Sequence, residues 1–541
     1  MSESSQYVSV PAGGPMQEVR RRFGRNVGLT IFARVVNMAR GVCVVPFLLH
    51  HLGLEAYGIW TTIFILVSYV GLTTLGLSNV YIKYVAEFHA RREYDKANAL
   101  LSTGLSITVP LCAALFAGFY FCWDWYAPWL HLPSQYAGEG KEAVLIVLAV
   151  FLSSIAFSAF GDVLAGAQQI ASTQIFLTLS LILEFILILW LVSAGRGVRG
   201  LAEAYLIRIL FNDGLTIWWA WRKLKWLRIS PRLFRCDSIG YVIHFGGVVQ
   251  LQTILDIFLS SVERLLGLSL VGVSTAGLMD VAKKWPTAYS SIPMAFFGAM
   301  LPATAHVDAA SHPSERMHNL RELYLNSSRY SNLCTALYVA LTVFWSHAIL
   351  YVWLGPELPM RQTLTTLFVV FSIALQFHML TGPGTSLLRG MGKVYEEFTY
   401  SIPNLLLLGV TLSVTWWTQR QWTALGIGIA VALATVLSAC ILLLRVHHVI
   451  GIQWRRFLGY VLLPGLIPFL PAAVLAWPVA WLIGNLDRWQ GAGVLMAAGL
   501  LYLAGTAVLL DRWVLSAAER EKGRSMVGNL FAVVRRGEAR A

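Results

Sequence analysis

Residues 175–193 read IFLTLSLILEFILILWLVS, an almost unbroken apolar run with one charge, Glu184. An α-helix needs about 20 apolar residues to cross the hydrocarbon core of a bilayer, which is roughly 30 Å thick. The run therefore predicts a transmembrane helix, which we place at 170–194. A charged side chain inside such a helix is costly, so Glu184 must either have a partner or serve a function.

Similar apolar runs recur along the whole chain. Hydrophobic residues make up 57% of its 541 residues and charged residues only 13%, against roughly a quarter in soluble domains. This composition excludes a water-soluble globular fold. We expect an all-α integral membrane protein of about fourteen transmembrane helices, the first at 27–50 and the last at 490–513.

Lys and Arg residues are concentrated in the loops on one side of the predicted helices. The linker after the sixth helix alone contains Arg222, Lys223, Lys225 and Arg228. Short cytoplasmic loops carry an excess of such residues, so both termini are expected in the cytoplasm. The net charge of +13 then indicates contact with anionic membrane lipids, and no nucleic-acid partner is expected.

The chain contains a weak internal repeat. Gly53 and Gly58 align at one common spacing with Gly272 and Gly277. Six helices are expected in each repeated unit, so both units have the same orientation in the membrane. This is the parallel-repeat plan of many transporters, whose substrate sites lie between the repeats.

The repeat predicts the organisation of the chain. Two six-helix lobes and two additional C-terminal transmembrane helices are expected. The predicted segments are a basic cytoplasmic tail at 1–26, the lobes at 27–221 and 238–445, a basic linker at 222–237, the additional helices at 446–513 and a second basic tail at 514–541.

Charged and polar residues inside the predicted helices are candidates for function, because a charge at the centre of a membrane helix costs about 2.5 to 3.5 kcal/mol on insertion scales. Arg pairs with phosphate oxygens through two nitrogens, and Lys acts as a compact positive charge. We therefore predict a cationic central cavity that binds an anionic diphosphate headgroup. Its residues are Arg34, Arg40, Lys283 and Lys284.

Three further residues are candidates for ion coupling or for the polar wall of this cavity: Asn37, Asp256 and Glu184. In the repeat, Asn37 aligns with Asp256. A buried carboxylate can carry a coupling proton when burial favours its neutral form. A structural ion pair is the alternative for both carboxylates. Asp280 could likewise neutralise Lys284, one helical turn further along.

No pattern of catalysis or of metal binding is found. The six cysteines have no paired spacing, and no Ser-His-Asp order is present. No predicted loop is long enough for a folded catalytic domain. We expect neither a metal nor a cofactor, and no enzymatic activity.

The segment PFLLHHLGLEAYGIW at 46–60, followed by Leu75-Gly76-Leu77 and a polar run to Ser102-Thr103, resembles the beginning of the polysaccharide-biosynthesis transporters. This family includes O-antigen and exopolysaccharide flippases. With the MATE drug exporters, it belongs to the multidrug/oligosaccharidyl-lipid/polysaccharide exporter superfamily. The resemblance implies a MATE-like fold with two lobes around a V-shaped cleft.

The resemblance also implies a function. It implies alternating-access translocation of an undecaprenyl-diphosphate-linked oligosaccharide across the bacterial inner membrane, for lipopolysaccharide O-antigen or exopolysaccharide synthesis. A polysaccharide polymerase and chain-length machinery are the expected partners, and a cation gradient is a candidate driving force.

Three alternatives remain open. A lipid II flippase has a similar number of helices. A MATE-type multidrug exporter of cationic drugs should favour acidic groups in its lumen, whereas basic residues predominate in these spans. A membrane polymerase or ligase of lipid-linked sugars would normally need a substantial outer loop.

Overall fold

The computed structural model describes residues 15–70, 77–130, 137–167, 169–235, 237, 247–310, 313–356, 360–517 and 519–521. Every regular element in these ranges is helical. Ten of the helices there are long and apolar enough to cross a membrane. These findings confirm the expected all-α membrane architecture. The predicted tails and the predicted linker lie only partly within the described residues.

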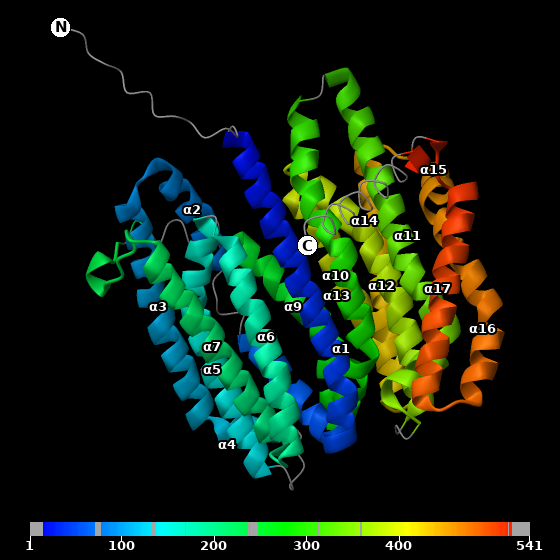
Figure 1. Ribbon diagram of the computed structural model, residues 1–541, viewed down its shortest axis with the longest axis horizontal. Coiled ribbons are helices and arrows are strands. Elements are labelled where there is room, and N and C mark those ends of the chain that lie inside the picture. Colours follow the sequence, from blue (N-terminus) through cyan, green and yellow to red (C-terminus); the bar gives the residue numbers. More distant parts are fainter. Residues whose placement is uncertain are drawn as a thin grey trace, which may run out of the picture. The chain divides into compact units, whose positions relative to one another are not determined.

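The chain divides into two compact units, and the first comprises Met1–Asp280. Its helices are shown in Figure 1. They are α1 (Pro15–Val70), α2 (Leu77–Arg91), α3 (Tyr94–Phe121), α4 (Trp123–Tyr126), η2 (Ala127–Leu130), α5 (Ala137–Gly166), α6 (Ile170–Ser193), α7 (Gly197–Lys223), η4 (Pro231–Leu233) and α9 (Gly247–Leu270). Helix α10 (Val273–Ala310) begins in this unit and continues into the second.

The second unit comprises Val281–Ala541. Its remaining helices are α11 (Pro313–Leu354), α12 (Arg361–Gly390), η6 (Val394–Glu397), α13 (Phe398–Gln419), α14 (Ala424–Ile450), α15 (Trp454–Phe457), η7 (Leu458–Leu462), η8 (Pro464–Leu466), α16 (Phe469–Gly484) and α17 (Arg488–Trp513). Helices α16 and α17 pack on α11. Trp345 of α11 donates a hydrogen bond to the carbonyl of Ala472, and Tyr502 donates one to the carbonyl of Leu337, each at 2.9 Å.

The core of the first unit contains many small and β-branched residues. Ala143, Val147, Ala202 and Ala276 are fully buried, and they belong to one cluster that joins α1, α5, α7 and α10. Lipid tails are as apolar as these side chains, so burial alone contributes little to helix association in a membrane. Close packing contributes instead, and small residues permit it.

The repeated glycines lie at bends and close contacts. Gly53 interrupts α1 with a φ of 78°, and Gly272 precedes α10 with a φ of 138°. Residues other than glycine rarely adopt such positive φ angles. A Cβ atom on Gly277 would lie 3.1 Å from the Cα atom of Gly58. The aligned glycines therefore allow α1 and α10 to pack closely within the first unit.

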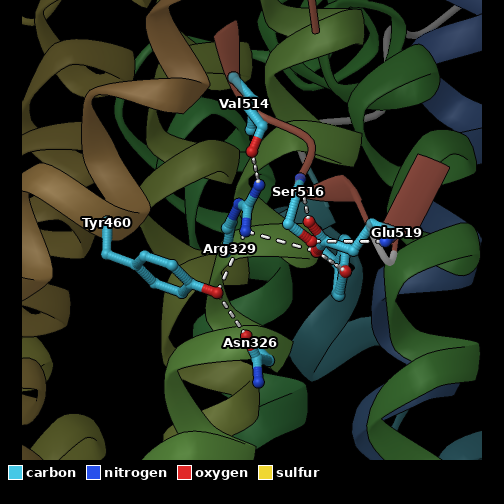
Figure 2. A network of polar contacts seen from close by, with 7 residues as sticks. Asn326, Arg329, Tyr460, Val514, Ser516 and Glu519 are labelled. Atoms are coloured by element: carbon cyan, nitrogen blue, oxygen red, sulfur yellow. Dashed lines mark hydrogen bonds and ion pairs between the residues drawn. The ribbon is translucent and has the colours of Figure 1, made fainter. Parts of the chain in front are cut away.

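The residues after α17 are attached to α11 by a polar network (Figure 2). Arg329, which is buried, donates to the carbonyl of Val514 and lies 3.4 Å from the carboxylate of Glu519. The hydroxyl of Tyr460 lies 3.1 Å from Arg329 and donates a hydrogen bond of 2.6 Å to Asn326. This network joins the end of the second unit's last helix to its longest one.

Candidate functional site

A cluster of charged side chains connects three helices of the first unit. Arg40 of α1 donates a hydrogen bond to the carboxylate of Glu184 on α6. Arg208 of α7 approaches the same carboxylate oxygen, with its Nε atom 3.2 Å away. We call Arg40, Glu184 and Arg208 the charge cluster. It contains two guanidinium groups for one carboxylate, so it carries a net positive charge.

The charge cluster is shielded from its surroundings. Glu184 is only 3% exposed, and the side chain of Arg208 is 15% exposed. Arg208 also lies over the ring of Tyr205, with its Cζ atom 4.8 Å from the ring centroid. Removing one partner of a buried ion pair typically costs about 3 to 5 kcal/mol, because the other charge is left uncompensated. The cluster therefore fixes how α1 packs on α6 and α7.

The predicted residues of α1 differ in their contacts. Asn37 accepts a hydrogen bond of 3.3 Å from Arg40 and thus borders the charge cluster. Arg34 lies further toward the start of α1, is exposed, and has no polar contact with the described residues. The structure thus brings Arg40, Asn37 and Glu184 together. Of the two predicted cations on α1, only Arg34 has a guanidinium that no described carboxylate neutralises.

The remaining predicted residues lie elsewhere. Asp256 is an exposed residue of α9 and has polar interactions of its own. Lys283 and Lys284 are half-buried residues of α10 in the second unit, and both have interaction partners. The charge of Lys283 acts on His378 of α12.

A second polar contact joins α1, α9 and α10 within the first unit. Asp280 accepts hydrogen bonds from the hydroxyl of Tyr57, at 2.6 Å, and from Arg264, at 3.1 Å. Arg264 is a partner of Asp280 that the sequence did not suggest, beside Lys284, which stays a prediction. Helix α9 continues to Leu270, and the carboxylate of Asp280 neutralises this arginine inside it.

Arg208 is the member of the charge cluster to which the sequence assigned no role. Glu184 and Arg208 lie on separate helices, so their distance along the chain does not reveal that they pair. The only available signal was the presence of a basic residue in an otherwise apolar helix. Among the described residues, no group of three or more His, Cys, Asp or Glu side chains could hold a metal ion.

Comparisons with known proteins found a relative in sequence and several structures of similar fold. No family model matches the chain. "Uncharacterized membrane protein EpsK" of Bacillus subtilis (strain 168) is 23% identical over 524 residues, which cover 92% of this chain and 97% of that protein.

Two solved structures have a similar fold. One is a multidrug resistance MATE family transporter of the MOP superfamily in an inward-facing conformation, with a TM-score of 0.64 and 16% identity over 77% of this chain and 94% of that one. The other is the lipid II flippase MurJ in an inward closed conformation, with a TM-score of 0.64 and 12% identity over 90% of this chain and 98% of that one. The expected MATE-like architecture is thus confirmed, and the chain has the fold of these transporters.

Proposed function

We propose that this protein is a flippase that moves an undecaprenyl-diphosphate-linked oligosaccharide across the bacterial inner membrane, for the synthesis of O-antigen or exopolysaccharide. In this proposal both termini lie in the cytoplasm, and the cargo is transferred by alternating access. A polysaccharide polymerase and chain-length machinery would use the delivered oligosaccharide. The protein acts as a transporter and performs no reaction on the sugar.

The observation that carries the proposal is the excess of positive charge on α1 and its neighbours. Glu184 neutralises one of the two arginines of the charge cluster, and Arg34 has no described acidic partner. A cation inside a membrane helix is costly unless it faces protein, water or an anion. A diphosphate headgroup supplies such an anion, and the planar guanidinium of Arg34 can bind it through two nitrogens.

One of the comparisons and the charge cluster itself support a lipid cargo. A protein named a lipid II flippase shares the fold over 90% of this chain. The multidrug transporter shares it too, but the charge cluster offers no free acidic group to a cationic drug, because Glu184 is already bound by two arginines. The positive cluster therefore favours an anionic cargo.

Within this proposal, the predicted cations have distinct roles. Arg34 binds the diphosphate, and Lys283 and Lys284 are the further cations predicted for an anionic headgroup. Arg40, which is bound to Glu184, contributes through the net charge of the cluster. Asn37 supplies a polar group beside it.

The test is translocation of a fluorescent undecaprenyl-diphosphate oligosaccharide in proteoliposomes, read out by an impermeant quencher. We expect Arg34→Ala, and the double variant Lys283→Ala with Lys284→Ala, each to slow flipping by about tenfold or more, which corresponds to roughly 1.4 kcal/mol. The matched control is Arg91→Ala. It removes an exposed arginine that pairs with Glu87 one turn earlier on α2, at 3.0 Å.

Two outcomes would contradict the proposal at different levels. Absence of flipping by the unaltered protein with several such lipids would reject the function. Export of an organic cation by the same vesicles would then favour a multidrug exporter. Flipping that is unchanged in both variants would reject the binding residues and leave the flippase activity standing.

A further inference from the structure

A crevice rich in hydroxyl groups lies within the first unit, apart from the charge cluster. It has a volume of about 200 Å³ and is formed by α2, α3 and α5. Two of its lining residues, Ser78 and Ser158, are exposed, and two others, Tyr81 and Thr108, are buried. It therefore leads from the surface of the unit into its interior. At about 30 Å³ per water molecule, this hydroxyl crevice has room for roughly six waters, or for one small molecule of comparable size.

The hydroxyl crevice lies near the middle of two helices that are long and apolar enough to cross a membrane. The apolar segments are Tyr94–Phe121 of α3 and Gly138–Gly166 of α5. Thr108 and Ser154 line the crevice and lie close to the midpoints of these segments. Substrate sites of transporters built from repeated units lie near the bilayer midplane. A ligand in the crevice would thus be held at the depth at which transporters hold their cargo.

The lining of the hydroxyl crevice favours a neutral ligand. Among the described residues that line it, none has an acidic, basic or imidazole side chain. Burying an ion without an opposite charge is far more costly than burying a neutral group that is hydrogen-bonded. The crevice is therefore unsuited both to a phosphate and to a metal cation.

The serines of the crevice are arranged to accept hydrogen bonds from a ligand. Ser78 donates its hydrogen to Asp162 at 2.7 Å, and Ser154 donates to the carboxylate of Asp213 on α7. Ser158 donates to a backbone carbonyl of its own helix at 2.8 Å. A hydroxyl that has donated its one hydrogen retains acceptor lone pairs. A ligand with several O–H groups can donate to these three oxygens.

The hydroxyl of Tyr81 can bind a ligand in the opposite sense. This side chain is only 2% exposed, yet its hydroxyl oxygen has no hydrogen-bond partner in the described part of the chain. A buried polar atom without a partner costs about 1 to 3 kcal/mol. An acceptor oxygen on a bound ligand removes this cost. The ligand therefore needs both donor and acceptor groups, and a hydroxyl supplies both.

The rest of the lining favours a sugar ring over a group of water molecules. It is apolar and consists of Leu77, Leu105, Phe151, Ile155, Ala156 and Ala159. A buried water needs about two to four polar partners, and waters against this wall would lack them. A pyranose ring has hydroxyl groups around its edge and C–H groups on its faces. It can therefore bond to the serines and pack on the apolar wall at the same time.

Two carboxylates behind the serines indicate which sugars fit. Asp162 and Asp213 accept the hydrogens of Ser78 and Ser154, so negative charge lies directly behind two acceptor oxygens of the crevice. This charge repels the carboxylate of an acidic sugar. A neutral hexose therefore fits the crevice better than a hexuronate does.

We propose that the hydroxyl crevice binds one neutral sugar ring, which donates hydrogen bonds to Ser78, Ser154 and Ser158 and accepts one from Tyr81. The binding of a free sugar requires only residues of the first unit. That the bound ring belongs to the transported oligosaccharide, so that the crevice selects neutral over acidic residues of the cargo, rests on the proposed flippase function.

The test uses the full chain in nanodiscs of neutral lipid, without any lipid-linked sugar. Saturation-transfer difference NMR follows glucose and galactose at increasing concentration, and empty nanodiscs give the background signal. We expect saturable binding of at least one of these hexoses. Glucuronate, measured in the same way, should bind about tenfold more weakly, because its carboxylate meets the charge of Asp162 and Asp213.

The matched variants are Ser158→Leu and Ser153→Leu. Both serines are exposed residues of α5 that donate to a carbonyl of their own helix at 2.8 Å, but of the two only Ser158 lines the crevice. Ser158→Leu fills the crevice with an apolar side chain and should weaken hexose binding by about tenfold or more. Ser153→Leu should bind as the unaltered protein does. Thermal unfolding of both variants verifies that they are folded.

Tyr81→Phe tests the site without filling it, because it removes one hydroxyl and keeps the ring packing. It should weaken hexose binding by about threefold to tenfold, the value of one hydrogen bond. An affinity that is unchanged in Tyr81→Phe overturns the assignment of this hydroxyl as a donor to the sugar.

The remaining outcomes decide between the site and its alternatives. Saturable hexose binding that Ser158→Leu weakens and Ser153→Leu leaves unchanged supports the site. If neither hexose binds, the crevice holds only water, and if the two leucine variants bind equally, the sugar binds elsewhere. Either result overturns the proposal. Equal affinities for hexose and glucuronate overturn the selection of neutral sugars.

This test is independent of flipping. A protein that binds a hexose in the crevice but moves no lipid-linked oligosaccharide keeps the site and loses the proposed function. A protein that moves the lipid but binds no hexose keeps the function and loses the site.

Discussion

Glu184 and Asp162 are two carboxylates in helices of the same unit, and their surroundings are opposite. Glu184 is bound by two arginines from α1 and α7. Asp162 has one hydroxyl donor and a buried oxygen without a partner among the described residues. Both belong to apolar runs of the sequence. The comparison shows that the helices packed against a membrane carboxylate decide how many partners it has.

The largest expected effect is on stability and comes from the charge cluster. Glu184→Gln keeps the shape of the side chain but leaves Arg40 and Arg208 without their anion. We expect a loss of about 3 to 5 kcal/mol, because two buried guanidinium groups remain uncompensated. Thermal unfolding of the purified protein in detergent measures this loss.

A second variant separates the ion pair from simple packing. Adding Arg208→Met to Glu184→Gln removes one of the unpaired charges and should recover part of the lost stability. If Glu184→Gln alone unfolds at the temperature of the unaltered protein, the cluster is not the structural element that we infer.

Asp162 should respond in the opposite way. Asp162→Asn removes a charge that has no described cationic partner, so we expect the free energy of unfolding to change by less than about 1 kcal/mol. The same thermal unfolding measurement applies. A loss as large as that of Glu184→Gln would show that Asp162 has a structural partner.

Sequence reasoning could reach the helices and part of the cluster. The apolar run at 170–194 predicted α6, and the single charge within it marked Glu184. The partner Arg208 could not be predicted, because pairing depends on how α6 packs against α7. The same limit applies to Asp162: its helix is predicted by the sequence, but its hydrogen bond from Ser78 on α2 is a property of the packed structure.

The position of Tyr81 offers a steric test of how α2 packs on α3. A Cβ atom on Gly104 of α3 would lie 1.8 Å from the hydroxyl oxygen of Tyr81. Gly104→Ala should therefore displace this ring and lower the free energy of unfolding by about 1 to 3 kcal/mol. Gly118→Ala, on the same helix, is the matched control because no atom lies within 4 Å of its added Cβ. Equal unfolding temperatures of the two variants in detergent would contradict this close contact.

Another small effect concerns a third carboxylate, Glu519, which lies beyond the membrane-spanning part of α17. Like Glu184 it is well supplied with partners, although it is partly exposed to water. Its partial burial would raise its pKa, but hydrogen bonds from Tyr330 and Ser516 and the charge of Arg329 outweigh this and lower the pKa to about 2. The ionised form is therefore the one that the fold stabilises.

The sign of the pH dependence follows from this lowered pKa. Glu519 contributes stability above the pKa of a free glutamate, about 4.3, and the contribution is lost as the pH falls toward 2. We expect Glu519→Gln to cost roughly 1 kcal/mol at neutral pH, the scale of an exposed ion pair. The difference from the unaltered protein should shrink steadily below about pH 4 in unfolding measurements. A difference that stays constant through this range would show that the carboxylate's charge is not what attaches the segment after α17 to α11.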